Sequence, residues 1–333
     1  MKKGLQLAIF LLFCSLSVSS QINRYGTPLI STFDNAQTGA GIKSFCITMD
    51  GRGVMYFGNE RGGVTTYDGS SWDHIALPGI GRVTALVTDS RGIVYAGGET
   101  DFGFLQPDHS GRFAWNSLKR LISDSAFSTT AGSITSVAAD TNGVCFTDGR
   151  RFYRLASGND SISVTDMEQD FGISSAMALV SFDNRIYIAD NKEGLFVSSD
   201  GTIERIPGGD KTAGSRFIRM LPYDRDNLII AAAGKGLMLF NIRTGVLTKN
   251  FGDRRAVSVL RNGMLTDLAI LPGNMIAASF GAKGGVFILN HEGKLLQHIA
   301  EETTSLREAS VTALYCDHTS NAQLWFCTIG YIN

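Results

Sequence analysis

The chain has 333 residues, of which 30 are lysine or arginine and 31 are aspartate or glutamate. The formal net charge of −1 is spread without any block of like charges, so the composition gives no electrostatic reason to expect nucleic acid or a membrane surface as a partner. About 310 residues follow the N-terminal targeting segment described next. That length usually means two domains, although a repeat fold of this size forms one body.

The N-terminus has the features of a signal peptide. Lys2 and Lys3 provide a basic start, residues 5–13 form an apolar stretch, and small residues follow. We therefore predict that residues 1–20 direct export and are then cleaved off. A lipid anchor at Cys14 is not expected, because a bulky residue precedes it. No later stretch approaches the ~20 apolar residues of a membrane-spanning helix, so no span is predicted.

A segment of roughly 45 residues then recurs six times, followed by a shorter seventh copy. Each copy reads as an apolar run, Asp or Asn with Gly, a second apolar run, a short polar gap, Gly and a third apolar run. A fixed period in this range indicates an array of small sheets, and here a β-propeller. Equivalent positions of the second run are Tyr56, Tyr95, Phe146, Tyr187, Ile230, Ala277 and Trp325.

The short apolar runs between Asp, Asn and Gly residues are typical of strands joined by tight turns. We predict an all-β fold over residues 21–333, a β-propeller of about seven four-stranded antiparallel blades. The first run of each copy is the most apolar, as expected for inner strands packed between neighbouring blades. These runs are Ser44–Met49, Val83–Thr88, Ile134–Ala139, Ala176–Phe182, Ile218–Pro222, Leu265–Leu271 and Val311–Cys316.

The two ends of the repeat array are expected to meet. Residues 29–33 precede the first full repeat and are predicted to complete the last blade, since an array of strands needs its edges covered. The seventh copy stops after its second run, so its third strand is predicted to be missing and the blade incomplete. Helical turns are expected only in residues 117–122 and 304–308.

Four cysteines follow the signal peptide, each inside an apolar run: Cys46, Cys145, Cys316 and Cys327. We interpret them as buried free thiols. A disulfide between Cys46 and Cys316 is the alternative, because their blades would be neighbours in a closed ring and an exported protein permits disulfides.

The repeats resemble those of two-component regulator propellers. The resemblance lies in Asp50-Gly-Arg-Gly-Val-Met-Tyr-Phe-Gly58 followed by Gly63-Val-Thr-Thr-Tyr-Asp-Gly-Ser-Ser-Trp72, and also in residues 83–113 and 321–326. Blades three to six depart from the usual Trp-Ile-Gly-Thr core of that repeat. The family resemblance implies the exported, periplasmic sensing part of a bacterial membrane receptor. In the family this part is followed by a β-sandwich, a membrane helix and a histidine kinase or a helix-turn-helix regulator.

None of those downstream parts occurs in the 333 residues. The resemblance therefore implies a ligand-binding sensor propeller of a two-component or one-component receptor, without its membrane helix and transmitter and without enzyme activity of its own. It also implies a carbohydrate-type ligand.

Loops that join second to third strands gather on one face of a propeller, and five of the six such gaps contain a cation. Converging cations would attract an anionic ligand such as an acidic saccharide. Solvated turn residues are the alternative interpretation. Aromatic residues near this face, Trp72, Phe102 and Trp115, either stack on sugar rings or pack against outer strands. The candidate ligand-binding residues are Arg61, Asp101, Phe102, Arg151, Lys192, Lys235 and Lys283.

The sequence predicts no catalytic residue, metal site or cofactor. The five histidines are scattered without metal-ligand spacing. Asp166, Glu168 and Asp170 form an acidic cluster that suits either glycoside cleavage or a solvated loop. An exported propeller enzyme, a glycan-acting hydrolase or a lyase of the streptogramin-lyase type, is the second hypothesis, and a protein-interaction scaffold is the third.

Overall fold

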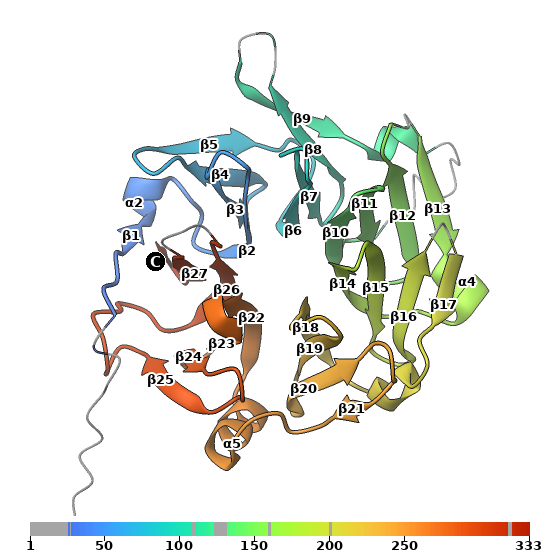
Figure 1. Cartoon of the computed structure of the whole chain (residues 1–333). Coiled ribbons are helices and arrows are strands. Elements are labelled where there is room, and N and C mark those ends of the chain that lie inside the picture. The colour runs from blue at the N-terminus through green and yellow to red at the C-terminus, as the bar shows by residue number, and fades with distance from the viewer. Residues whose placement is uncertain are drawn as a thin grey trace, which may run out of the picture.

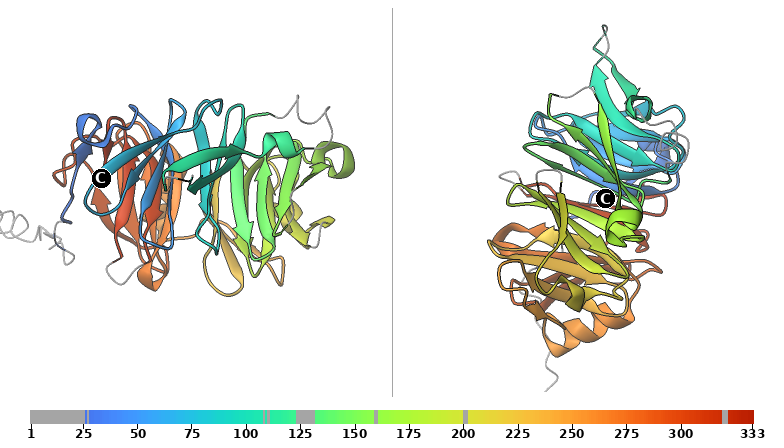
Figure 2. Two further views of the ribbon diagram at one scale, coloured as in Figure 1. Left: turned by 90° about the horizontal axis from the view of Figure 1, so that it is seen from above. Right: turned by 90° about the vertical axis from the view of Figure 1, so that its right-hand side faces the viewer.

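The computed structural model describes residues 26, 28–107, 109, 111–122, 132–158, 161–199, 202–318 and 322–333. The predicted signal peptide, residues 1–20, lies outside them. The described residues form seven four-stranded antiparallel sheets arranged as blades around a central axis (Figure 1). Seen from the side, the blades stand next to one another in a ring about one strand tall (Figure 2). The predicted all-β propeller is confirmed.

Blades one to six each use four consecutive strands. The inner strands of blades one to seven are β2 (Ser44–Met49), β6 (Val83–Thr88), β10 (Ser136–Asp140), β14 (Ala176–Phe182), β18 (Phe217–Pro222), β22 (Leu265–Leu271) and β26 (Val311–Cys316). The second strands are β3 (Met55–Asn59), β7 (Val94–Gly98), β11 (Gly143–Thr147), β15 (Arg185–Asp190), β19 (Asn227–Ala232), β23 (Met275–Phe280) and β27 (Leu324–Thr328).

The third strands are β4 (Gly63–Tyr67), β8 (Phe102–Pro107), β12 (Arg151–Ala156), β16 (Gly194–Ser199), β20 (Gly236–Asn241), β24 (Gly285–Leu289) and β28 (Tyr331–Ile332). The outer strands are β5 (Trp72–Ala76), β9 (Phe113–Ser117), β13 (Ile162–Asp166), β17 (Thr202–Arg205), β21 (Leu247–Thr248), β25 (Leu295–Ile299) and β1 (Phe33–Asp34).

The seventh blade corrects one prediction. Its third strand is present as β28, which pairs with β27 on one side and with β1 on the other. The expectation of a missing third strand was wrong because Gly330, with a φ of 87°, turns the chain tightly enough for a two-residue strand to form. The ring closes through an N-terminal strand, as predicted, but through Phe33–Asp34 rather than residues 29–33.

Three α-helices and three 3-10 turns connect the described strands. They are α2 (Asn35–Thr38), α4 (Met167–Phe171), α5 (Arg254–Asn262), η1 (Lys119–Leu121), η2 (Gly209–Thr212) and η3 (Pro272–Asn274). The turn expected in residues 117–122 is confirmed by η1, whereas residues 304–308 are not helical. Helices α2, α4 and α5 and the turns η2 and η3 were not predicted, because helical turns were expected only in residues 117–122 and 304–308. Helix α5 is the longest of these. Asp253 caps it by accepting a hydrogen bond from Ala256 N at 2.8 Å, and Ala256 and Leu260 bury its inner face.

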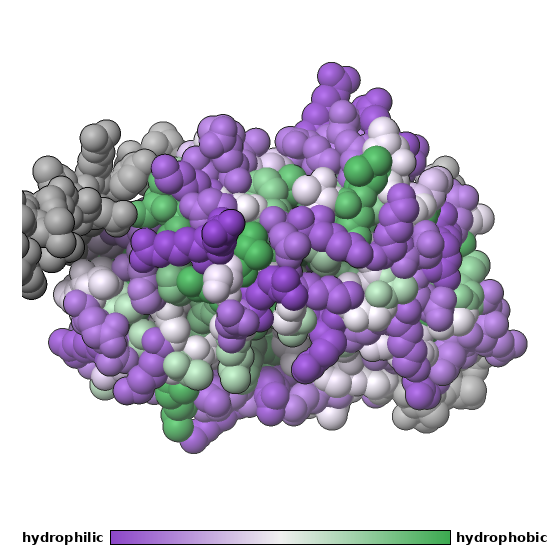
Figure 3. All heavy atoms as spheres, turned by 90° about the horizontal axis from the view of Figure 1, so that it is seen from below, coloured by the Kyte–Doolittle hydropathy of each residue, from purple (hydrophilic) through white to green (hydrophobic). Residues whose placement is uncertain are grey.

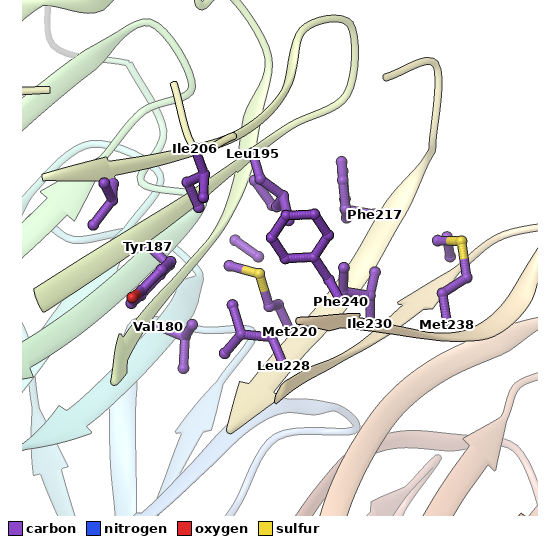
Figure 4. Close-up of a cluster of buried hydrophobic side chains, with 14 residues drawn as sticks. Val180, Tyr187, Leu195, Ile206, Phe217, Met220, Leu228, Ile230, Met238 and Phe240 are labelled. Carbon is purple, nitrogen blue, oxygen red and sulfur yellow. The ribbon is translucent and has the colours of Figure 1, made fainter. Parts of the chain in front are cut away.

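The core lies between the blades. Strand β19 shows why second strands read as continuous apolar runs, because both of its faces are buried. Leu228 and Ile230 join a cluster of 14 residues between blades four and five (Figure 4). The intervening Ile229 and Ala231 join the next cluster, between blades five and six. By contrast, the rim in Figure 3 is mostly hydrophilic, with scattered hydrophobic residues.

The four described cysteines are free thiols, so the Cys46–Cys316 disulfide is not formed. Cys145, Cys316 and Cys327 are buried, and burial raises the pKa of each of their thiols. The interpretation as buried thiols is confirmed for these three, while Cys46 is half-buried beside the axis.

Candidate ligand site at the propeller axis

One side of the ring carries the loops that were predicted to bind a ligand. We call this side the mouth face. It consists of the loops that join second to third strands and the segments that lead into the inner strands. Backbone hydrogen bonds hold the two sets together. Ala233 N donates to the Arg216 carbonyl at 2.9 Å in blade five, and Gly281 N donates to the Met264 carbonyl at 2.9 Å in blade six.

Four predicted cations lie in these mouth-face loops. Lys192 and Lys235 each donate from Nζ to a serine hydroxyl at 2.9 Å, Ser174 and Ser215 respectively. The exposed Arg61 has no hydrogen bond or ion pair to any described residue. Lys283 Nζ lies 4.0 Å from Glu301, which follows an outer strand. Lys192 and Lys235, in adjacent blades four and five, are therefore the predicted cations that the structure holds over inner strands.

Phe102 belongs to the core rather than to the mouth face. Its side chain is 1% exposed, and its ring lies 4.8 Å from that of Phe146 and 5.1 Å from that of Tyr153. A ligand could reach this ring only if blades two and three separated. The prediction that Phe102 stacks on a sugar is therefore corrected. A strand-initial residue points into the interface between blades, although it follows a polar loop.

Asp101 and Arg151 also make contacts within the fold rather than at the mouth face. Asp101 accepts hydrogen bonds from Ser117 Oγ at 2.8 Å and from Trp115 Nε1 at 3.4 Å, which ties the loop before β8 to the outer strand β9. Arg151 Nη1 lies 3.6 Å from Asp148 Oδ2, and the same carboxylate accepts from Tyr153 Oη at 2.8 Å. These contacts explain the two charges without a ligand.

Sequence reasoning missed a ring of residues at the axis. Six of the seven inner strands have a register shift near their start, and such a bulge leaves one residue outside the ladder. A cavity of about 140 Å³ on the axis is lined by this position in all seven blades. We call these residues the axial ring: Phe45, Thr84, Thr135, Met177, Ile218, Thr266 and Thr312.

Three threonines of the axial ring fasten one blade to the next. Their hydroxyls donate to a backbone carbonyl at, or two residues before, the start of the following inner strand. Thr84 donates to Ile134 at 2.6 Å, Thr135 to Ala176 at 2.9 Å and Thr312 to Ser44 at 2.5 Å. We call these three bonds the threonine clasps. The last one joins blade seven to blade one, at the closure of the ring.

An ion pair occupies the same cavity, one residue further along the inner strands. Arg219 Nε lies 3.4 Å from Asp267 Oδ1, which links blade five to blade six. Asp267 also accepts from Leu268 N and from Leu314 N, each at 2.8 Å, and so reaches blade seven. Burial raises the pKa of Asp267 above its ordinary value, while Arg219 and the two amides oppose the rise.

A sequence signal for this pair did exist. The equivalent position is occupied by small residues in the other five blades, namely Cys46, Ala85, Ser136, Ala178 and Ala313. Arg219 and Asp267 therefore stand out as charges inside apolar inner runs, which marks them as candidates for a buried functional or structural pair.

Two other kinds of site that the sequence raised, a metal site and an acidic catalytic cluster, are not formed by the residues that the structure describes. No group of three or more His, Cys, Asp or Glu residues there could hold a metal ion. Asp166 caps α4, and Glu168 lies 3.4 Å from Arg150. Two residues of the acidic cluster therefore have structural partners at the end of an outer strand. None of the described helices is long and apolar enough to cross a membrane.

Comparison with known proteins found no matching family model and no matching curated protein. Solved structures do match in fold. The extracellular domain of the putative hybrid two component system BT4673 from B. thetaiotaomicron has a TM-score of 0.68 at 16% identity, covering 91% of this chain and 39% of that chain. The same kind of domain from BT3049 of that organism has a TM-score of 0.66 at 16% identity, covering 90% of this chain and 41% of that chain.

A lyase also matches. Catalytically inactive virginiamycin B lyase from Staphylococcus aureus with quinupristin has a TM-score of 0.68 at 14% identity, covering 91% of this chain and 97% of that chain. The chain thus spans about two fifths of the two sensor structures and nearly all of the lyase. It is a seven-bladed β-propeller that is structurally like the extracellular domains of hybrid two-component systems and like virginiamycin B lyase.

Proposed function

We propose that the chain is the exported sensing propeller of a bacterial signalling receptor and binds a small molecule at the mouth face without transforming it. The observation that carries this proposal is the convergence at one end of the axis. Arg219 lies half-exposed in the axial cavity, and the mouth-face loops of the same and the preceding blade hold Lys235 and Lys192. The family resemblance of the repeats and the likeness to two sensor extracellular domains support it.

The position of the site between two blades would allow ligand binding to change the geometry of the propeller. Each blade of a propeller packs mainly on its two neighbours, so a ligand that contacts two blades changes how those blades sit against each other. Asn191 Oδ1 already accepts from Phe217 N at 2.8 Å, which joins the mouth-face loop of blade four to the inner strand of blade five. A ligand beside this bond would act on the geometry that is passed to downstream signalling domains. Its proposed class is carbohydrate, acidic saccharides included, and its proposed location is the periplasm.

A propeller lyase is the second candidate, favoured by one specific observation. The fold resembles that of virginiamycin B lyase, and an ion pair, Arg219 with Asp267, lies in its axial cavity. Asp267 would then be the general base, because it lies on the axis with a raised pKa beside a cation that could hold a developing negative charge.

Binding and turnover on one ligand panel separate the two candidates. Isothermal titration calorimetry with neutral and acidic saccharides should show saturable binding that weakens when Lys192→Ala and Lys235→Ala are combined. The matched control removes two exposed cations on the opposite face, Arg225→Ala and Lys294→Ala, and should bind as the wild type does. Equal affinity in both double variants would contradict the mouth-face site. Product detected by mass spectrometry, and lost in Asp267→Asn, would favour the lyase.

A further inference from the structure

We infer that Arg219 binds a carboxylate group and that the cavity of about 140 Å³ on the axis, which we call the neck, is the acid-binding end of the ligand site. This inference rests on the proposed function, whose mouth-face site it extends into the axis. It specifies the ligand as an organic acid, whereas the proposed function holds for a neutral ligand as well.

The first argument is the state of the guanidinium group. The Arg219 side chain is 46% exposed and lines the axial cavity, so part of the guanidinium group is open to the lumen of that cavity. Its nearest partner is Asp267, reached through Nε at 3.4 Å. The two terminal nitrogens make no hydrogen bond to any residue that the structure describes. They form the planar fork that binds a carboxylate through two parallel hydrogen bonds.

The second argument is that Asp267 is already occupied. One carboxylate oxygen accepts from Leu268 N and the other from Leu314 N, each at 2.8 Å. The negative charge of Asp267 is therefore directed at backbone amides of blades six and seven. Through its contact with Nε, Asp267 orients Arg219 and leaves the two terminal nitrogens available to the lumen. Asp267 is thus a positioning residue for Arg219.

The third argument is the chemistry of the lining. The hydroxyls of Thr84, Thr135 and Thr312 donate to backbone carbonyls, so their hydrogens are not available to a ligand in this neck. Among the described lining residues, which include the hydroxyls of Ser136 and Thr266, Arg219 is the cationic donor. A neutral sugar needs several donors and acceptors around its ring, whereas a carboxylate needs the fork that Arg219 offers.

The fourth argument is size. The cavity on the axis measures about 140 Å³, and a deeper one of about 60 Å³ shares Arg219 and Asp267. Ligand pockets that enclose whole drug-sized molecules measure about 300–1,000 Å³. The neck therefore takes the acid group, and the body of the ligand stays at the mouth. Met177 is 39% exposed at the neck and Met264 is 65% exposed on the mouth face, so an apolar body is accommodated there as well as a sugar ring.

The competing interpretation is that the ion pair only joins blades five and six. In that case Arg219→Met lowers the thermal stability, and carboxylates do not bind to the wild-type protein at all. A direct readout on the wild type avoids any dependence on how well the variant folds. The ¹⁵N resonance of Arg219 Nε, assigned by its absence in Arg219→Lys, should shift on addition of a carboxylate that reaches the fork.

The test uses two pairs of probes in calorimetry, glucuronate with glucose and hexanoate with hexanol. At least one acid should bind saturably, and its neutral counterpart should bind about 10- to 100-fold more weakly, the range expected for hydrogen bonds to a charged group. Arg219→Met should abolish binding of the acid, and Arg219→Lys should weaken that binding. The matched control is Arg225→Met, an exposed arginine in the same blade, which should leave binding unchanged.

Each outcome decides something. Binding of glucuronate alone identifies an acidic saccharide, binding of hexanoate alone identifies an aliphatic acid, and binding of both identifies the acid group as sufficient. The inference is overturned if neither acid binds, or if an acid binds equally well to Arg219→Met without moving the Nε resonance. Binding of a neutral saccharide that depends on Lys192 and Lys235 would leave the proposed function standing while this inference fails.

Discussion

The threonine clasps at the axis allow a direct test of how the ring is held together. Replacing Thr84, Thr135 and Thr312 with valine keeps the side-chain shape and removes the three hydroxyl donors. Each lost hydrogen bond should cost about 1 kcal/mol, because the carbonyl that accepted it is left at the partly buried axis. The three bonds lie at different blade junctions, so their costs should add to about 3 kcal/mol.

Urea unfolding measures this cost as a change in the free energy of unfolding. A loss of about 3 kcal/mol is a large share of the roughly 5–15 kcal/mol that stabilises a typical domain. The matched control replaces the same three residues with serine, which keeps the hydroxyls and should recover most of the stability. The reasoning is refuted if the triple valine variant unfolds within about 0.5 kcal/mol of the wild type, or if the triple serine variant is equally unstable.

Three further predictions follow from the same structure. Met177→Thr should raise the free energy of unfolding in urea by about 1 kcal/mol, because by analogy with the Thr135–Ala176 clasp the added hydroxyl would donate to the Phe217 carbonyl, at a junction without a clasp. Unchanged stability would contradict this analogy. Phe102→Ala should lower the free energy of unfolding by about 3–5 kcal/mol, because the ring is buried in the core. A decrease below about 1 kcal/mol would contradict this packing. Burial, with the Asp50 charge, raises the pKa of Tyr56 to about 12. The contribution of Tyr56 to stability should therefore be complete below the unfolded-state pKa of about 10 and should be lost as the pH rises through 12. Ultraviolet titration of the tyrosines checks this, and ionisation of Tyr56 near pH 10 would contradict it.

The sequence predicted the blades well because each inner strand is defined locally. Strands β2, β6, β14, β22 and β26 have the predicted bounds, since a short apolar run enclosed by turn residues identifies a strand from its local sequence. Helix α5 was missed for a physical reason. Its buried stripe is Ala256 and Leu260 alone, which is too short to stand out as a helical period among strands.

The candidate site was harder to predict because it depends on contacts between blades. Lys192 and Lys235 were identified from their turns, but nothing local tells which turn cations are held over an inner strand and which, like Lys283, lie beside an outer one. Arg219 and Asp267 are 48 residues apart and meet only when blades five and six pack side by side. Each of the two charges in an apolar run was visible in the sequence, whereas their pairing was not.

One junction at the axis differs from the others in a way that bears on function. The side chains that would join blade four to blade five there are Met177 and Ala178, which cannot form hydrogen bonds, and among the described residues no axial side-chain hydrogen bond links β14 to β18. Apart from the Asn191–Phe217 hydrogen bond of the mouth-face loop, the junction depends on the 14-residue apolar cluster of Figure 4. Apolar packing is not directional, so it resists a small sliding motion less than a fixed hydrogen bond does.

The same junction carries the proposed ligand contacts. Lys192 lies on blade four, and Lys235 and Arg219 lie on blade five, so an acidic ligand held by all three would add the polar link that the axis lacks there. Binding should then slow hydrogen exchange of the backbone amides of β14 and β18 more than those of β6 and β10, which Thr84 already joins. Equal protection at both junctions would mean that the ligand does not act across blades four and five.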